Sequence, residues 1–125
     1  MTPPRHPARR LLPRVALVLV VGMLLYAGLL QNPAPKVFHG VDKLYHLSGF
    51  AILAVCTRLA FPRGSAALQV VAMLALGAGI EVVQAFIPGA TATVWDFLAD
   101  AVGVAVGLAL MTLPPLRRVG AWIRG

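Results

Sequence analysis

Four long apolar segments constrain this chain more than any other feature of its sequence. They cover residues 15–31, 44–61, 66–87 and 97–113. Each is close to the ~20 residues that a helix needs to cross a ~30 Å hydrocarbon layer. Hydrophobic residues make up 59% of the 125 positions and charged residues only 12%, a balance outside that of ordinary soluble domains. The sequence therefore predicts an all-α fold, a four-helix transmembrane bundle.

Prolines and glycines end the apolar segments. Proline lacks the backbone N–H that a helix needs and displaces the residue before it, so it marks the end of a helix. Such residues follow each of the four segments: Pro33, Pro35, Pro62, Gly64, Pro88, Gly89, Pro114 and Pro115. The short loops favour antiparallel neighbours. We expect one membrane domain over residues 15–113, between basic tails at 1–14 and 114–125.

The arginines predict the orientation of the bundle. All nine precede the first segment, flank the loop between the second and third, or follow the fourth: Arg5, Arg9, Arg10, Arg14, Arg58, Arg63, Arg117, Arg118 and Arg124. Positively charged loops stay in the cytoplasm, so we place both termini there, with Trp122 at head-group depth. The first segment also fits a secretory signal peptide, but residues 30–35 offer only poor cleavage positions, which favours a retained helix.

The net charge of +7 does not indicate a nucleic-acid partner. The basic residues lie at the ends of apolar segments and form no stripe with interleaved aromatic residues. The lipid bilayer is the partner that this composition predicts. The single cysteine, Cys56, lies inside an apolar segment, where a small packing residue is the simplest interpretation.

Polar residues of the apolar segments gather at the opposite, exoplasmic end. All four acidic residues fall there in the predicted topology, close to a lysine and a histidine that begin the second helix. Residues three or four apart share a helix face, so several of these side chains can point in one direction. The predicted polar site comprises Asp42, Lys43, His46, Glu81, Gln84, Asp96 and Asp100.

Spacing and depth indicate that these side chains face the bundle interior. In the fourth segment the two carboxylates share one narrow sector with Gly103 and Gly107, and glycines let a neighbouring backbone approach closely. Glu81 lies ~9 Å inside the end of its helix at 1.5 Å per residue. An ionisable group costs ~2.5 to 3.5 kcal/mol at the centre of a spanning helix. Glu81 therefore needs a partner, a proton or a water-filled cavity.

Simpler interpretations exist for single members of the site. Gln84 alone is best explained by an interhelical hydrogen bond, worth about 0.6 kcal/mol. Asp42 and Asp96 each also suit the N-cap of the helix that they begin, where acidic residues are favoured. For the group as a whole we favour binding or catalysis, because a purely stabilising contact could be apolar.

Three polar motifs follow one another in a fixed order along residues 41–110. They are Asp42-Lys43 with His46 and Phe50, then Glu81 and Gln84 before Pro88-Gly89, then Asp96 before Gly103 and Gly107. In order and spacing they resemble the VanZ-like family of small membrane proteins. That family usually has an arginine just after the turn and an asparagine four residues after the aspartate, where this chain has Ala90 and Asp100. The resemblance therefore implies a related but more acidic site.

Similarity to this family implies a multi-pass protein of the bacterial cytoplasmic (inner) membrane that serves the cell envelope. The family's named member is linked to resistance to the glycopeptide teicoplanin. The resemblance thus raises an expectation of glycopeptide-type antibiotic or envelope stress resistance. It supplies neither a mechanism nor a cofactor.

Three functions remain open for the polar site. The one we favour is binding or processing of a polar head group at the exoplasmic face, on a lipid-linked or peptidoglycan-related ligand. The second is an enzyme acting on a lipid-linked substrate, with His46 and Glu81 or Asp100 as acid and base or as ligands of a divalent metal. The third is a proton-coupled carrier formed by a homo-dimer, in which Glu81 and Asp100 would bind the protons. No catalytic motif such as His-Glu-x-x-His occurs.

Overall fold

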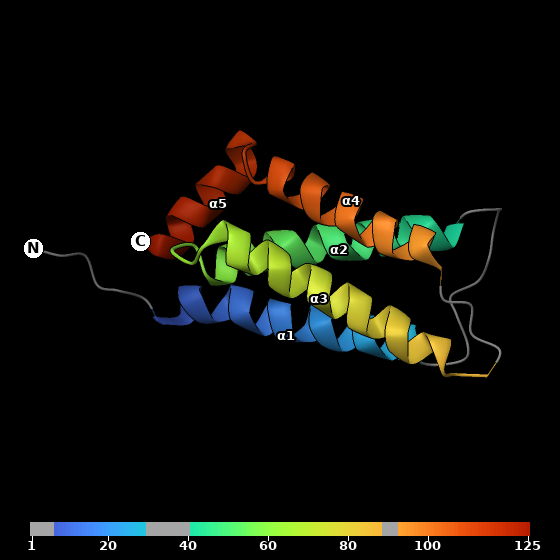
Figure 1. Ribbon diagram of the computed structural model, residues 1–125. Helices are drawn as coiled ribbons and strands as arrows, with labels where there is room; N and C mark the ends of the chain where they lie inside the picture. The colour runs from blue at the N-terminus through green and yellow to red at the C-terminus, as the bar shows by residue number, and fades with distance from the viewer. Residues whose placement is uncertain (1–6, 30–40, 89–92) are drawn as a thin grey trace, which may run out of the picture.

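Five helices make up the described part of the chain, and no strand occurs within it (Figure 1). The computed structural model describes residues 7–29, 41–88 and 93–125, without the side chains of Val41 and Asp42. Its helices are α1 Pro7–Leu29, α2 Val41–Ala60, α3 Ala66–Ala85, α4 Val94–Leu110 and α5 Pro114–Arg124. The all-α prediction is confirmed. Several residues named above lie outside the described ranges: Arg5, Pro33, Pro35, Gly89 and Ala90.

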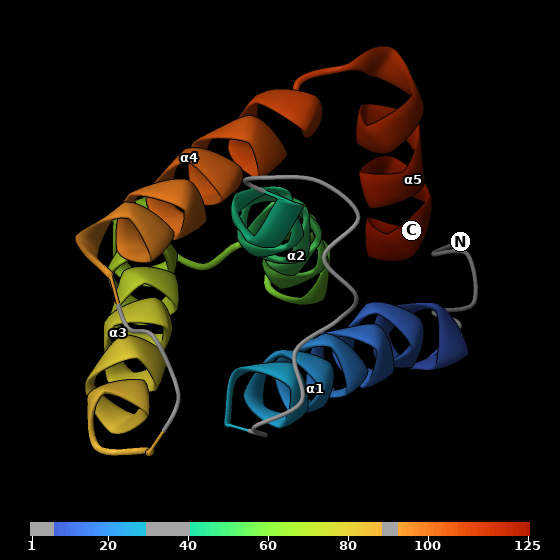
Figure 2. The same cartoon turned by 90° about the vertical axis from the view of Figure 1, so that its right-hand side faces the viewer.

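Helix α2 lies at the centre of the molecule, with the other four helices around it (Figure 2). It packs most extensively against α4 and next against α1. Phe50, Leu53 and Ala54 of α2 form the core together with Met73 of α3 and Val104 of α4. This central position explains how α2 can carry more polar side chains than its neighbours, because the surrounding helices shield it.

Large apolar side chains cover the outside of the bundle. Val18 of α1 is 70% exposed and Leu68 of α3 is 68% exposed. Extended apolar surface is rare on soluble monomers, whereas lipid is its natural surrounding. Helices α1 and α3 are each long and apolar enough to cross a membrane, and α4 with α5 passes the same test only as a pair bent by 76°. Two or up to three helices therefore suit a membrane by length and composition.

The helix boundaries differ from the prediction at both ends of the chain. Helix α1 begins at Pro7 and not at residue 15, and it continues through Pro13. Proline is favoured in the first turn, and the arginines and leucines that follow are good helix formers. Helix α5 occupies most of the predicted C-terminal tail and begins with two prolines. Residues 7–14 of the first tail and nearly all of the second tail are therefore helical.

Arg58 ties together the turn between α2 and α3. Its guanidinium donates to the carbonyl oxygen of Gly64 at 3.0 Å and to Oε1 of Gln69 at 3.1 Å. The Gln69 amide in turn donates to the carbonyl oxygen of Phe61 at 2.9 Å. Arg58 thus satisfies a backbone oxygen of the turn and fixes the Gln69 side chain that satisfies another.

Candidate functional site

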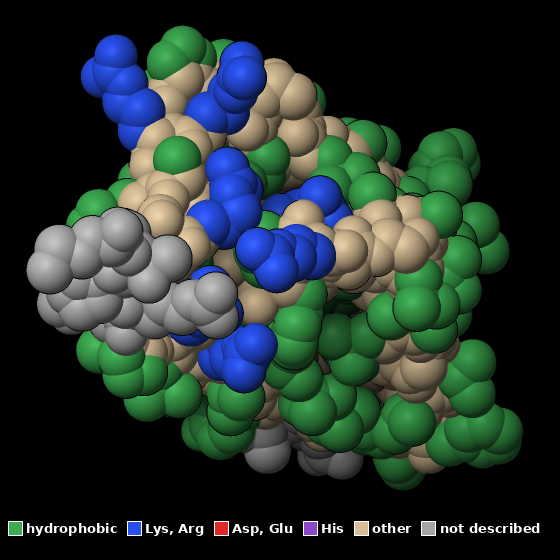
Figure 3. All heavy atoms as spheres, turned by 90° about the vertical axis from the view of Figure 1, so that its left-hand side faces the viewer, with side chains coloured by type: hydrophobic (Ala, Val, Ile, Leu, Met, Phe, Trp, Pro, Cys, Tyr) green, Lys and Arg blue, Asp and Glu red, His purple; other side chains and the backbone are tan. Residues whose placement is uncertain are grey.

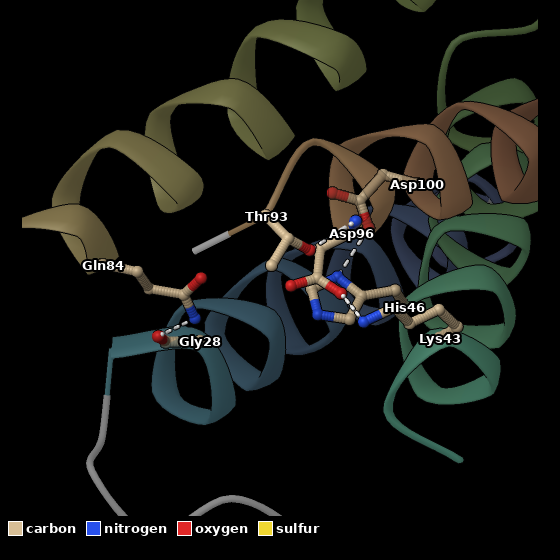
Figure 4. A network of polar contacts seen from close by, with 7 residues as sticks. All are labelled: Gly28, Lys43, His46, Gln84, Thr93, Asp96 and Asp100. Atoms are coloured by element: carbon tan, nitrogen blue, oxygen red, sulfur yellow. Dashed lines mark hydrogen bonds and ion pairs between the residues drawn. The ribbon is translucent and has the colours of Figure 1, made fainter. Parts of the chain in front are cut away.

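The first turns of α2 and α4 and the last turns of α3 meet at one end of the molecule, opposite α5 (Figure 1). Figure 4 shows the polar side chains that these elements bring together. Helical spacing explains the arrangement, because His46 lies one turn after Lys43 and Asp100 lies one turn after Asp96. Two layers of polar contacts follow, one near the helix ends and one deeper in the bundle.

The deeper layer is a contact between His46 and Asp100. The Nδ1 atom of His46 lies 2.8 Å from Oδ1 of Asp100, and Asp100 is only 1% exposed. On its other side Asp100 lies against Gly77 of α3, where an added Cβ would come within 2.8 Å of Oδ2. A glycine is needed there for α3 to approach the carboxylate. We did not predict Gly77, although its position one turn before Glu81 is a signal that could have revealed it.

The outer layer is an ion pair between Lys43 and Asp96. The Lys43 Nζ atom lies 2.9 Å from Oδ1 of Asp96, and their side chains are 41% and 6% exposed. Thr93 begins α4 as its N-cap, because its Oγ1 accepts the backbone N–H of Asp96 at 3.2 Å. The interpretation of Asp96 as N-cap is therefore wrong. Asp96 instead lies in the first turn of α4, and its carboxylate is free to pair with lysine.

Gly103 and Gly107 lie where α4 crosses α2. A Cβ on Gly103 would collide with the backbone carbonyl of Leu47, and one on Gly107 with that of Ala51. The missing side chains let the two helices approach closely, which is the role of small residues in membrane helix packing. This close crossing holds His46 and Asp100 at a fixed separation.

Glu81 completes the deeper layer but is not paired within it. Both of its carboxylate oxygens are buried, and among the described residues neither accepts a well-formed hydrogen bond, since the backbone of Thr93 offers only a weak one. One donor atom from each of His46, Glu81 and Asp100 can be chosen so that all lie within 4.8 Å of one another. The same three residues were the candidate metal ligands in the sequence. Glu81 thus offers two acceptor oxygens to any ligand that reaches the end of the bundle.

His46, Glu81 and Asp100 are suitable ligands for a divalent metal, but their ligand atoms are not arranged around a single ion as they stand. Imidazole and carboxylate groups bind zinc and similar ions at ~2.0 to 2.2 Å, so two ligand atoms of one ion cannot be more than about 4.4 Å apart. A separation approaching 4.8 Å would need a rotamer change of Glu81 to close the site. The residues can therefore hold an ion after a small rearrangement.

Gln84 and Asp42 are not part of the contacts just described. The Gln84 amide donates to the backbone carbonyl of Gly28, which joins α3 to α1 (Figure 4). This interhelical bond is what we expected of Gln84 alone. Asp42 lies in the first turn of α2, after the residue that begins the helix, so its interpretation as the N-cap is wrong. Its side chain lies outside the described part of the chain.

The charges of the site favour a ligand that donates hydrogen bonds or carries positive charge. Lys43 is already paired with Asp96, and His46 is engaged by Asp100. Acceptor capacity is left at both carboxylate oxygens of Glu81 and, beside its ion pair with Lys43, at Oδ1 of Asp96. An ammonium group, sugar hydroxyls or a metal ion would complement it, whereas a phosphate approaching Glu81 would be repelled.

An open apolar groove of about 410 Å³ begins beside the outer ion pair. Lys43 and Trp95 line its polar end, and Leu44, Leu47, Leu98 and Val102 are among the residues that continue it along α2 and α4. A groove of this composition is suited to a hydrocarbon chain. Polar groups and apolar surface therefore lie next to each other at this end of the bundle.

Comparison with known proteins identifies no relative of this chain. No protein family, no curated protein and no solved structure matches the chain. Its own contacts, burial and charges are therefore the evidence for what it does.

Proposed function

We propose that this chain is a multi-pass protein of the bacterial cytoplasmic membrane that binds the polar head group of a lipid-linked or peptidoglycan-related ligand at the exoplasmic face. The observation that carries the proposal is the buried carboxylate of Glu81, which accepts no well-formed hydrogen bond from the residues that the structure describes, beside the His46–Asp100 contact. A buried acceptor without a full partner costs about 1 to 3 kcal/mol. A contact that served helix packing alone could be apolar and would avoid this cost.

In this proposal α1 to α4 cross the bilayer as a four-helix bundle. Arginines are concentrated at the end of the bundle that carries α5, and the polar site lies at the other end. Positive residues remain in the cytoplasm, which places both chain termini there and the polar site outside. Helix α2 is covered by its neighbours on the side that carries His46, while Leu44 and Ile52 remain 48% and 54% exposed and can face lipid.

The site and the groove together indicate the chemistry of the ligand. The Glu81 oxygens can accept hydrogen bonds from hydroxyl or ammonium groups, and the groove along α2 and α4 can hold the hydrocarbon chain of a membrane-anchored molecule. Glycosylated envelope lipids combine both features. The order of the motifs supports a VanZ-like protein, and with it a contribution to resistance against glycopeptide-type antibiotics or envelope stress.

A second candidate is a metal-dependent enzyme acting on a lipid-linked substrate. It is favoured by the donor atoms of His46, Glu81 and Asp100, which lie within 4.8 Å of one another. A metal held there would supply Lewis-acid chemistry to a head group bound at the same place. Glu81 would be a ligand in this case and a direct contact to the head group in the first.

Native mass spectrometry of the protein released from membranes tests both candidates. We expect the wild-type chain to retain an organic ligand with a polar head group. The Glu81→Gln variant should retain it at least tenfold less, because a hydrogen bond to a charged group contributes about 1.5 to 3 kcal/mol. Metal content is measured on the same samples.

Gln84→Ala is the matched control, because this side chain lies one turn away on α3 but bonds to Gly28. It should retain the ligand as the wild type does. A metal lost only from Glu81→Gln, without an organic ligand, would favour the enzyme. Equal retention by the wild type and Glu81→Gln would contradict both candidates.

A further inference from the structure

A second pocket, with apolar walls and several basic side chains, lies at the opposite end of the molecule from Glu81. It has a volume of about 230 Å³ and lies between the N-terminal part of α1, the α2–α3 turn and the end of α5. Four arginines line it: Arg10, Arg14, Arg63 and Arg124. Figure 3, which views that end of the molecule, shows basic side chains gathered on this face.

The charges of these four arginines are not neutralised by neighbouring acids. None of them forms an ion pair within the described ranges. The chain's four acidic side chains all belong to the beginning of α2, the later part of α3 and the beginning of α4, at the far end of the bundle. Four like charges around one small pocket repel one another, so an anion placed among them is strongly attracted.

Contacts around the pocket hold its walls in place. The Arg14 guanidinium lies over the ring of Phe61, 5.4 Å from its centroid. Arg9 lies over the ring of Trp122 at 4.8 Å, which fastens α5 to α1. Ile123 of α5 is buried beside the pocket, only 7% exposed. The arginines therefore project from a packed surface and not from free chain ends.

Helix α5 has the character of a helix that lies along a membrane surface. It is bent by 76° from α4 and buries Gly120 and Ile123, while Arg117 and Arg118 are exposed. Amphipathic helices with basic polar faces lie at the head-group level of the bilayer. The arginine pocket is then placed at the depth of lipid phosphates.

We propose that this pocket binds a phosphate group. Arginine presents paired N–H donors that match phosphate oxygens, and basic pockets between membrane helices bind anionic head groups. The pocket is smaller than the ~300 to 1,000 Å³ of cavities that hold whole drug-sized molecules. It therefore fits the phosphate of an anionic lipid or a free phosphate ion. This inference does not depend on the function proposed for the Glu81 end.

Lipid retention by the purified full chain in detergent tests the inference. We expect the wild type to retain phosphatidylglycerol in native mass spectra at least tenfold more than phosphatidylcholine, whose head group is neutral overall. The variant Arg63→Gln with Arg124→Gln should lose on the order of tenfold or more of that preference, because each arginine near an anionic head group contributes about fivefold. Titration with inorganic phosphate distinguishes the two sources of the phosphate group.

The control variant is Arg117→Gln with Arg118→Gln, which removes the same charge from the same end but outside the pocket. It should change retention by less than about twofold. Displacement of the lipid by millimolar phosphate would support a soluble ion as the ligand, and resistance to it would support the lipid. Equal losses in both double variants would overturn the inference, as would equal retention of the two lipids by the wild type. Helix content measured by circular dichroism separates lost binding from lost folding.

Discussion

Replacing Asp100 by leucine is expected to lower the free energy of unfolding by about 3 kcal/mol, because removal of one partner from a buried pair leaves the other without compensation. Asp100 is 1% exposed and lies 2.8 Å from Nδ1 of His46. Leucine cannot accept a hydrogen bond, so the half-buried imidazole of His46 would lose the partner of its Nδ1 atom. Equilibrium unfolding of the wild type and the variant in mixed detergent micelles measures this difference in the free energy of unfolding.

Asp100→Asn is the matched control, because it keeps the shape of the side chain and an acceptor oxygen for His46. It should cost less than about 1 kcal/mol. Asparagine is also the residue that the VanZ-like resemblance leads one to expect at this position. The double variant with His46→Leu should recover part of the loss, since no imidazole then remains unpaired. Equal losses for Asp100→Asn and Asp100→Leu would show that the pair does not stabilise the fold.

Replacing Glu81 by leucine should have the opposite effect and raise the free energy of unfolding by about 1 to 3 kcal/mol. Its two buried oxygens accept no well-formed hydrogen bond in the described part of the chain, so folding desolvates them without full compensation. Binding groups are commonly retained at such a cost in stability. The same substitution should abolish ligand retention, so stability and binding should change in opposite directions.

Gln84→Leu provides the comparison on the same helix. The Gln84 amide donates to the carbonyl of Gly28, so leucine removes an interhelical bond of about 0.6 kcal/mol and should be mildly destabilising. The change in the free energy of unfolding is therefore expected to be positive for Glu81→Leu and negative for Gln84→Leu. A loss of stability in Glu81→Leu as large as that in Asp100→Leu would mean that Glu81 is a structural partner.

Helical spacing predicted which polar side chains lie on the same face of a helix. Residues one turn apart had to share a face, which brought Asp96 and Asp100 to the same side of α4 as Gly103. The pairing partners could not be predicted in this way. Lys43 pairs with Asp96 and His46 with Asp100 because the glycines of α4 fix its register against α2, and a sequence contains no direct record of that register.

The two ends of the chain were the least predictable part of the fold. The arginines and prolines around Pro13 suggested a tail, yet they belong to α1. Helix α5 was missed because Pro114 and Pro115 were read as the end of the preceding helix, whereas proline is also favoured in the first turn of a new one. Packing against other helices stabilises such segments more than their own propensity does.

The most direct test of this account is the side of the membrane on which the Glu81 end lies. Single cysteines at Val94, which is 74% exposed beside the site, and at Arg118 on α5 are introduced after Cys56→Ser removes the chain's own thiol. A thiol reagent that cannot cross membranes is then applied to intact cells. The account predicts that Val94→Cys reacts at once and that Arg118→Cys reacts only after the membrane is opened. The reverse pattern, or equal reaction at both positions in intact cells, would contradict it.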